Sequence, residues 1–233
     1  MMILFLIIIM AILFIIHSFL PTYYHKKLST NTIKKGPGEG IMLTFDDGPH
    51  EQYTEQLLDV LLENRVRATF FVVAKNAKKH PHLIKRMQEE GHLIALHSLE
   101  HRNAWFYSYF YTKKDFEKSL AILNEIGVKC HYYRPPWGHT NLFTSYFVNK
   151  YQLKMMFWNV SVQDWKYNSV SLIIQNKLLR EIKLHSIICL HDAGHNVYSD
   201  PTAPERTIEA LKTTLPILKK QGVSFITPER GSL

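Results

Sequence analysis

The feature that most constrains the fold is an alternation, beginning after Gly40, of short apolar runs with longer amphipathic segments. Such alternation is typical of repeated strand–helix units. The runs with the length and composition of buried strands are Ile41–Phe45, Ala68–Val73, His92–Leu96, His131–Tyr133, Lys154–Asn159, Ile187–Leu190 and Val223–Ile226. The segments with helical periodicity are Tyr53–Glu63, Pro81–Glu90, Lys114–Ile126, Asn141–Lys150, Ser169–Ile182 and Pro204–Lys220. The pattern predicts an α/β domain whose parallel sheet either closes into a barrel or stays open.

An apolar stretch from Met2 to Leu20, uncharged when His17 is neutral, precedes this domain. At about 1.5 Å per helical residue it is just long enough to cross a bilayer. We therefore expect a transmembrane signal anchor over residues 1–20, a polar linker over 21–40 and the folded domain over 41–233. A cleaved signal peptide is the alternative, but the stretch has no basic segment before it and no small-residue cleavage pattern after it.

Four lysines bear on the orientation of this anchor. Lys26, Lys27, Lys34 and Lys35 all follow the apolar stretch, and the positive-inside rule favours a cytoplasmic position for such a flank. Long domains are exported regardless of flanking charge. We expect a single-pass protein of the cell membrane with an extracytoplasmic catalytic domain, although the lysines argue the other way.

Composition narrows the partners only in part. The formal net charge of +8 and the pI near 9.3 favour contact with polyanions, including nucleic acid, acidic lipid headgroups or an anionic cell wall. Aromatic residues that could stack bases do not alternate with the lysine pairs, so nucleic acid is not an expected partner. The two cysteines, Cys130 and Cys189, are too few for a disulfide scaffold or a cysteine-built zinc site.

Polar residues directly after the predicted strands are the candidates for a functional site. In barrels and in open parallel sheets alike, function lies at the carboxyl ends of the strands. The residues in these positions are Asp46, Asp47, His97, Arg134, Asp164 and His191. We expect them to meet at one mouth of the sheet.

Their chemistry suits a hydrolytic metal site. Asp46 and Asp47 are adjacent at a strand end and face different directions, so one carboxylate can bind a metal while the other acts as a base. His97 and His101 are four residues apart, and imidazole suits zinc and similar metals. Two histidines and one carboxylate with open positions for water are a standard hydrolytic arrangement. A turn with two carboxylates and a packed histidine pair are the alternatives.

Arg134 and His191 have supporting roles in this interpretation. The two prolines after Arg134 hold its guanidinium near a fixed direction, from which it can fork onto a carboxylate such as Asp46. His191 follows an apolar strand and can titrate near neutrality, as a general acid must. A structural salt bridge and a packed histidine are the alternatives.

In order and spacing, these motifs resemble those of the polysaccharide deacetylases with a NodB homology domain, carbohydrate esterase family 4. The matching stretches are Thr44–Pro49 with the strand Ala68–Val72, then His97–His101, Arg134–Gly138, Asp164–Trp165 and Leu190–Asp192. The resemblance extends from about Gly40 to the C-terminus and implies a distorted (β/α)7 barrel, preceded here by the single N-terminal transmembrane helix. This fold agrees with the seven predicted strands.

The resemblance also implies a role for each matching residue. The metal ligands would be Asp47, His97 and His101, with zinc as the expected divalent ion and cobalt or nickel as alternatives. The catalytic residues would be the base Asp46, the acid His191, Arg134 bracing the base and Asp164 tuning the acid. The residues at the substrate would be Pro136, Trp137, Gly138, Trp165, Cys189 and Leu190, with a backbone N–H near Trp137 binding the oxyanion.

Three positions depart from the family pattern. Ser161 stands where the fourth motif often starts with an aspartate, and Trp137 where tyrosine is also common. Cys189 stands where many members have a leucine that closes the pocket on the acetyl methyl. We expect the smaller Cys189 to affect acyl or sugar selectivity.

The expected function is removal of N-acetyl groups from glycans that contain N-acetylglucosamine, with peptidoglycan or chitin-type oligosaccharide as substrate. A glycolipid deacetylase is an alternative, because an anchored domain would meet headgroups at its mouth. A carbohydrate-binding pseudoenzyme is another, although every expected ligand, base and acid is present.

Overall fold

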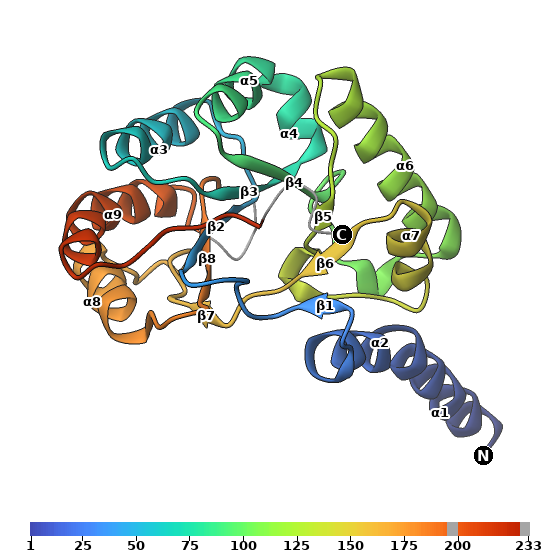
Figure 1. Ribbon diagram of the computed structural model, residues 1–233. Coiled ribbons are helices and arrows are strands. Elements are labelled where there is room, and N and C mark those ends of the chain that lie inside the picture. Colours follow the sequence, from blue (N-terminus) through green and yellow to red (C-terminus); the bar gives the residue numbers. More distant parts are fainter. Residues whose placement is uncertain (195–199, 229–233) are drawn as a thin grey trace.

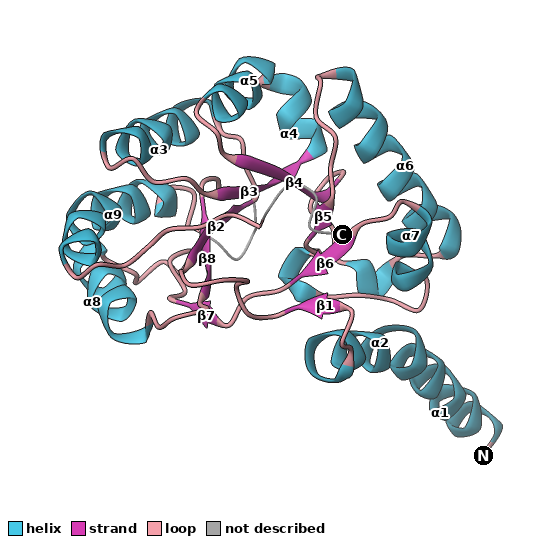
Figure 2. Cartoon of the chain, in the orientation of Figure 1, coloured by secondary structure: helices cyan, strands magenta, loops and turns pink. Residues whose placement is uncertain are grey.

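Parallel strands joined in one curled sheet organise the chain (Figures 1 and 2). The computed structural model describes residues 1–194 and 200–228, and within them the sheet has eight strands in the order β1-β6-β5-β4-β3-β2-β8-β7. The strands are β1 (Thr32–Ile33), β2 (Met42–Asp46), β3 (Thr69–Val73), β4 (Leu93–Ser98), β5 (Tyr132–Tyr133), β6 (Lys154–Met156), β7 (Val160–Ser161) and β8 (Ile187–His191).

Helices cover the outer face of this sheet (Figure 1). They are α3 (Glu51–Glu63), α4 (Ala74–Lys79), α5 (Pro81–Glu89), α6 (Tyr109–Glu125), α7 (Thr144–Lys150), α8 (Ser171–Glu181) and α9 (Ala203–Lys220), with short 3-10 segments η3 (Ala104–Phe106) and η4 (Pro136–Gly138). At the start of α6 the side chain of Ser108 caps the helix by accepting a hydrogen bond from the Tyr111 N–H.

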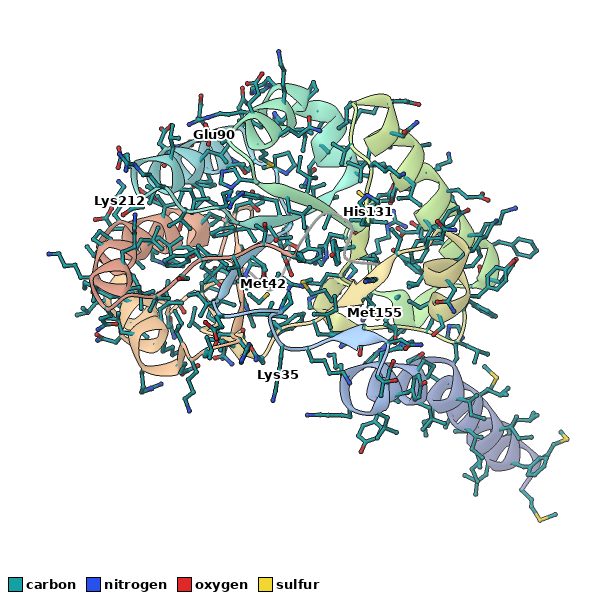
Figure 3. The ribbon with its side chains drawn as sticks, viewed as in Figure 1. Lys35, Met42, Glu90, His131, Met155 and Lys212 are labelled. Carbon is teal, nitrogen blue, oxygen red and sulfur yellow. The ribbon has the colours of Figure 1, made fainter. Side chains whose placement is uncertain are left out.

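The central strand β2 shows how the sheet separates two cores. Leu43 and Phe45 belong to the cluster between sheet and helices, whereas Met42 belongs to a smaller cluster in the interior of the curl. Because successive side chains of a strand point to opposite faces, Thr44 and Asp46 lie on the same face as Met42. Figure 3 shows Met42 within the curl and Lys212 at the periphery. The interior face of β2 therefore carries one of the two expected carboxylates.

The fold class is confirmed as a curled parallel half-barrel, with differences in its strands. β1 and β7 were not predicted, because two residues are too short to show alternation. The run Val223–Ile226 does not form a strand; among the described residues its ladder contact is one bridge between Ile41 and Phe225. The end strands β1 and β7 are not neighbours in the strand order, so the sheet curls without closing.

The N-terminal apolar stretch is part of one long helix. Met2–Leu28 spans 27 residues and is apolar and long enough to cross a membrane. It comprises α1 (Met2–Phe14), the π-helical turns η1 (Ile15–Phe19) and η2 (Tyr24–Leu28), and α2 (Leu20–Tyr23) between them. The helix α1 has no buried residue and projects away from the domain (Figure 1).

The expected polar linker differs from what the structure shows. Of residues 21–40, those up to Leu28 continue the helix, and Thr32–Ile33 form β1, which pairs with β6. The length and polarity of this segment suggested a spacer. Its small polar residues instead serve as buried hydrogen-bonding groups against the domain.

Thr22 is the centre of this helix–domain contact. Its hydroxyl donates to the Thr140 carbonyl at 2.9 Å and accepts from the Thr140 N–H at 3.0 Å and from Trp105 Nε1 at 2.9 Å. One turn away, the His25 ring lies within hydrogen-bond distance of the Thr140 and Ser145 hydroxyls. Burial, with a contribution from Lys34, lowers the pKa of His25 to about 4, so the ring is neutral in this contact at pH 7.

Replacing Thr22 tests whether the helix is a structural part of the domain. Thr22→Val keeps the volume but leaves the donors of Thr140 and Trp105 without their acceptor. We expect the free energy of unfolding of the full chain in detergent to fall by about 2–4 kcal/mol, because each buried donor left unpaired costs about 1–3 kcal/mol. Thr214→Val is the matched control, since the Thr214 hydroxyl is also buried and, within the described part of the chain, bonds to a carbonyl of its own helix α9. Equal effects of the two substitutions would contradict the contact.

Candidate metal centre and active site

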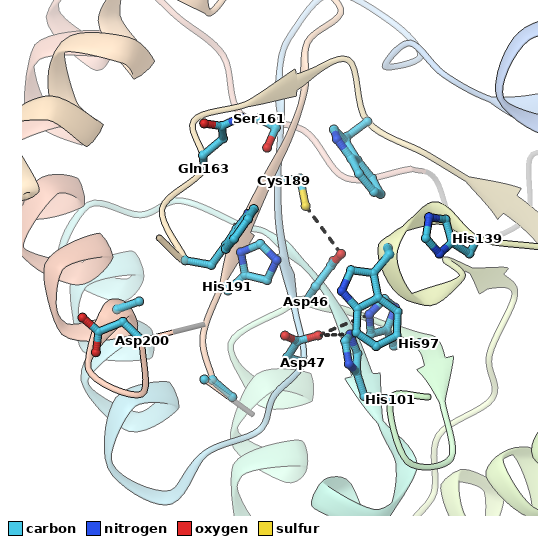
Figure 4. A pocket seen from close by; sticks show the side chains of 16 residues that line it. Asp46, Asp47, His97, His101, His139, Ser161, Gln163, Cys189, His191 and Asp200 are labelled. Carbon is cyan, nitrogen blue, oxygen red and sulfur yellow. Dashed lines mark hydrogen bonds and ion pairs between the residues drawn. The ribbon is translucent and has the colours of Figure 1, made fainter. Parts of the chain in front are cut away.

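A pocket of about 710 Å³ opens at the carboxyl ends of the strands (Figure 4). That volume lies in the range of small-molecule sites. Most of the side chains predicted for the site line it, namely Asp46, Asp47, His97, His101, Trp137, Trp165, Cys189 and His191. The separate strand ends therefore meet at one mouth, as the strand pattern predicted.

Asp47, His97 and His101 converge in this pocket. Asp47 Oδ1 lies 2.9 Å from His101 Nε2 and 3.3 Å from His97 Nε2, and one ligand atom from each residue lies within 4.8 Å of the other two. Burial alone would raise the pKa of Asp47, but the two histidines hold it well below its usual value. The three residues can thus present one charged oxygen and two imidazole nitrogens to a cation.

A hydrogen bond fixes which nitrogen of His97 is available. His97 Nδ1 lies 2.7 Å from the backbone carbonyl of Arg134. Because a carbonyl oxygen only accepts, Nδ1 carries the hydrogen and Nε2 keeps its lone pair. This outer hydrogen bond is the usual means by which proteins orient a metal-binding imidazole.

The environment of Asp47 Oδ1 fits a metal ion better than it fits hydrogen bonding. This atom is buried, and among residues 1–194 and 200–228 no donor gives it a hydrogen bond of regular geometry, despite the two close nitrogens. An unpaired buried carboxylate oxygen costs free energy unless a cation or donor satisfies it. The donor set of two imidazoles and a carboxylate suits zinc and related divalent metals.

The backbone around the ligands is held in an uncommon conformation. Asp47, His101 and Trp137 have positive φ values of 81°, 53° and 53°, which non-glycine residues rarely adopt. Strain of this kind persists where the surroundings fix it, typically at functional sites. At His101, the Ser98 hydroxyl accepts the backbone N–H at 2.7 Å.

Asp192 fixes the turn that carries the two aspartates, a role the sequence did not predict. Its buried carboxylate accepts the Gly48 N–H at 3.1 Å and the Thr54 hydroxyl at 2.6 Å. A Cβ on Gly48 would overlap this carboxylate. Position 48 must therefore be glycine because Asp192 packs directly against its backbone.

Arg134 holds Asp46 from below the pocket. Its fully buried guanidinium donates through Nη1 to Asp46 Oδ1 and to the Thr44 hydroxyl, both at 2.7 Å. The contact expected between Arg134 and Asp46 is present. The other oxygen of Asp46 lies 3.5 Å from the Cys189 thiol. Burial, followed by the charge of Asp46, raises the pKa of this thiol, so the thiol stays protonated.

His191 pairs with Asp164 on the other side of the pocket. His191 Nδ1 lies 2.9 Å from Asp164 Oδ1, and the His191 N–H donates to Asp164 Oδ2 at 2.9 Å. Burial alone would lower the pKa of His191, but Asp164, followed by Asp47 and Asp46, raises it to about 10. The imidazole is therefore protonated at neutral pH, and its pKa lies above the near-neutral value expected from the sequence.

The predicted substrate residues divide into two groups. Trp137, Trp165 and Cys189 line the pocket, whereas Pro136, Gly138 and Leu190 are buried and do not. The pocket is also lined by residues that the sequence did not single out: His139, Trp158, Gln163, Ala193, Gly194, Asp200 and Ala203. Four of these had a signal, because they adjoin a matching motif: His139 follows Arg134–Gly138, Gln163 precedes Asp164–Trp165, and Ala193 and Gly194 follow Leu190–Asp192.

The N-terminal helix reaches the rim of this pocket. Lys26 Nζ donates to the Trp137 carbonyl at 3.2 Å and lies 5.9 Å from the centre of the Trp158 ring. Both tryptophans line the pocket. Lys26, in the segment expected to be a linker, thus contacts the loop that contains the positive-φ residue Trp137.

Comparison with known proteins identifies a family. A family profile described as polysaccharide deacetylase matches residues 33–156. The chain is 32% identical over 189 residues to a peptidoglycan-N-acetylglucosamine deacetylase of Bacillus cereus, covering 80% of this chain and 85% of the relative. It is 32% identical over 194 residues to a chitooligosaccharide deacetylase of Sinorhizobium fredii, covering 78% and 86% of the two chains.

Solved structures agree in fold. The crystal structure of the Bc1960 peptidoglycan N-acetylglucosamine deacetylase, in complex with an N-oxidanyl-benzamide, superposes with a TM-score of 0.77 at 28% identity. The match covers 84% of this chain and 90% of that one. A pseudoenzyme from Bacillus anthracis, at 22% identity and a TM-score of 0.72, shares the fold alone.

Gly48→Ala tests the packing that positions the two aspartates. The added methyl group must displace the Asp192 carboxylate or the turn, and overpacking of this kind costs about 1–3 kcal/mol. We expect a matching loss of thermal stability and weaker binding of Zn²⁺ in calorimetric titration. Gly36→Ala, whose methyl group would make only ordinary contacts, should change neither quantity. Unaltered zinc affinity in Gly48→Ala would show that the turn does not depend on this contact.

Proposed function

The chain belongs to the polysaccharide deacetylase family, and from that premise we propose that it removes N-acetyl groups from glycans containing N-acetylglucosamine. We propose Asp47, His97 and His101 as the ligands of a divalent metal, with zinc as the first candidate and cobalt or nickel as alternatives. The observation that carries the proposal is the buried Asp47 Oδ1, which lies 2.9 and 3.3 Å from two imidazole nitrogens, beside a carboxylate held by arginine. These are the parts that hydrolysis of an amide requires.

A divalent metal bound there would lower the pKa of a water and polarise the acetamide carbonyl. Asp46 is the proposed base for that water. Arg134 donates to Asp46 Oδ1, so the carboxylate is held in one orientation and Oδ2 is left toward the pocket. The Cys189 thiol at Oδ2 is a weak donor that an incoming water can displace.

His191 is the proposed acid for the departing amine. Asp164 engages Nδ1 and thereby selects Nε2 as the nitrogen that gives its proton to the substrate. The Thr207 hydroxyl donates to Asp164 Oδ2 at 3.0 Å, so the carboxylate itself is held in place. For the oxyanion we propose a backbone N–H at the Trp137 turn, where the rigid positive-φ conformation supports a fixed donor.

The substrate class follows from the relatives and the pocket. Relatives named as deacetylases of peptidoglycan N-acetylglucosamine and of chitooligosaccharide support a glycan built on that sugar. Trp137, Trp158 and Trp165 line the pocket, and aromatic faces suit the apolar faces of sugar rings. A lipid-linked glycan is the second candidate, because the N-terminal helix contacts the pocket rim through Lys26.

We propose a cell-membrane location with residues 1–20 crossing the bilayer and the domain 41–233 outside the cytoplasm. The exposed, apolar α1 supports an anchor. A substrate in the cell wall supports an external domain, although Lys26, Lys27, Lys34 and Lys35 favour the opposite orientation.

Acetate release by the full chain in detergent tests the function directly. With Zn²⁺, Co²⁺ or Ni²⁺ added, we expect acetate from chitooligosaccharides or peptidoglycan fragments. Asp46→Asn should lower kcat about 10²–10⁴-fold while metal still binds, because it removes only the base, and His97→Ala should lose both metal and acetate release. Asp59→Asn, at an exposed position on α3, is the matched control.

Failure of the wild-type chain to release acetate from any glycan would contradict the proposed class. Glycan binding by wild type and Asp46→Asn alike, without turnover in either, would instead indicate a pseudoenzyme.

Cys189→Leu tests the acyl pocket. The larger side chain would fill the wall beside Asp46, and one methylene in an apolar pocket changes discrimination about 10–200-fold. We expect kcat/KM for an N-propionyl glycan to fall at least about tenfold more than that for the N-acetyl glycan. Cys130→Leu, outside the pocket, is the control. An unchanged ratio of the two constants would exclude Cys189 from acyl selection.

A further inference from the structure

A group of exposed apolar side chains surrounds the point where the N-terminal helix leaves the domain. It consists of Phe106, Tyr109, Phe110, Leu142 and Tyr146, which are 75%, 38%, 79%, 55% and 55% exposed. We call this group the apolar collar. Large exposed apolar groups on one part of a surface indicate contact with another molecule or a membrane.

The collar is continuous with the helix. The Phe106 ring stacks on Phe14 at 5.9 Å, and the Leu142 N–H donates to the His17 carbonyl at 2.9 Å. The Phe143 ring lies between His17 and Tyr109, at 5.6 and 5.4 Å. Phe106 and Leu142 therefore lie at the level of helix residues 14 to 17, and Tyr109 is joined to the same level through Phe143.

The part of the helix that is free of the domain, α1, is too short to cross a bilayer. The 13 residues of α1 extend about 20 Å at 1.5 Å per residue. The hydrocarbon core of a bilayer is about 30 Å thick and needs about 20 helical residues. The missing 10 Å corresponds to residues 15–20, four of which are apolar and 42–54% exposed. Within this stretch, Phe19 lies beside Trp105 and His17 beside Phe143.

We propose that the apolar collar inserts into the boundary between headgroups and acyl chains of the same bilayer that α1 crosses. This inference rests on the proposed membrane anchor. If residues 15–20 lie within the bilayer, the collar residues at their level must lie there too. Aromatic side chains are enriched at that depth, and the net charge of +8 suits acidic headgroups.

The collar would also fix the distance of the pocket from the membrane. Lys26, at the pocket rim, follows Leu20 by six residues, which corresponds to about 9 Å along a helix. The pocket would therefore stand close to the headgroups, and the glycans it meets would be those held near the bilayer surface.

Spin labels on the full chain in lipid nanodiscs test the proposal. Labels are placed by Phe106→Cys, Phe110→Cys or Leu142→Cys, in a Cys130→Ala background. For each label we compare the relaxation caused by oxygen with that caused by chromium oxalate. We expect the ratio of the two to be several-fold higher for the collar labels than for a Leu62→Cys label. Leu62 is a matched control, since it is 57% exposed and lies on α3 away from the collar.

A Leu6→Cys label in α1 separates the possible failures. Membrane-like relaxation at Leu6 with water-like relaxation at the collar would overturn the collar proposal and leave the anchor intact. Water-like relaxation at both would overturn both. None of these readings uses acetate release, so failure of the proposed catalytic function is detected independently.

Discussion

The buried guanidinium of Arg134 joins the parts of the site that must act together. Its side chain donates to Asp46 and Thr44 on β2. It also donates to the carbonyls of Met156, at the end of β6, and of Phe157, just beyond it. The backbone carbonyl of Arg134 orients His97. An ion pair removed from water gives little net stability unless all its groups are satisfied. Here acceptors surround the guanidinium, which offsets the desolvation cost of the ion pair. Arg134 therefore positions both the proposed base Asp46 and the proposed metal ligand His97.

Around that pair, the site separates its titratable groups by environment. Asp46 is paired with the Arg134 guanidinium, and Asp47 faces two imidazoles that a metal can share. Asp164 and the more distant aspartates keep a proton on His191. Three carboxylates within one interior thus have different neighbours, and such a separation would let one pocket hold both the proposed base and the proposed acid.

The sequence predicted the residues of the candidate site more fully than the residues that surround and position them. Asp46, Asp47, His97, Arg134 and His191 follow long buried strands, and the carboxyl ends of parallel strands converge. Asp192, Trp158 and Asp200 depend on tertiary packing that no local periodicity encodes. The prediction of a strand at Val223–Ile226 was wrong for a related reason. An apolar run indicates that a segment is buried, but it does not indicate that its backbone pairs with a neighbouring strand. β1 was missed since two residues give no pattern.

The segment after the apolar stretch shows most clearly what composition conceals. Lysines, threonines and a histidine indicated a solvated linker, yet Thr22 and His25 are buried and Lys26 contacts the loop of Trp137. A long polar side chain can lie along a protein surface with its charge on a carbonyl. The N-terminal helix, the strained turn at Trp137 and the pocket rim therefore form one connected structure.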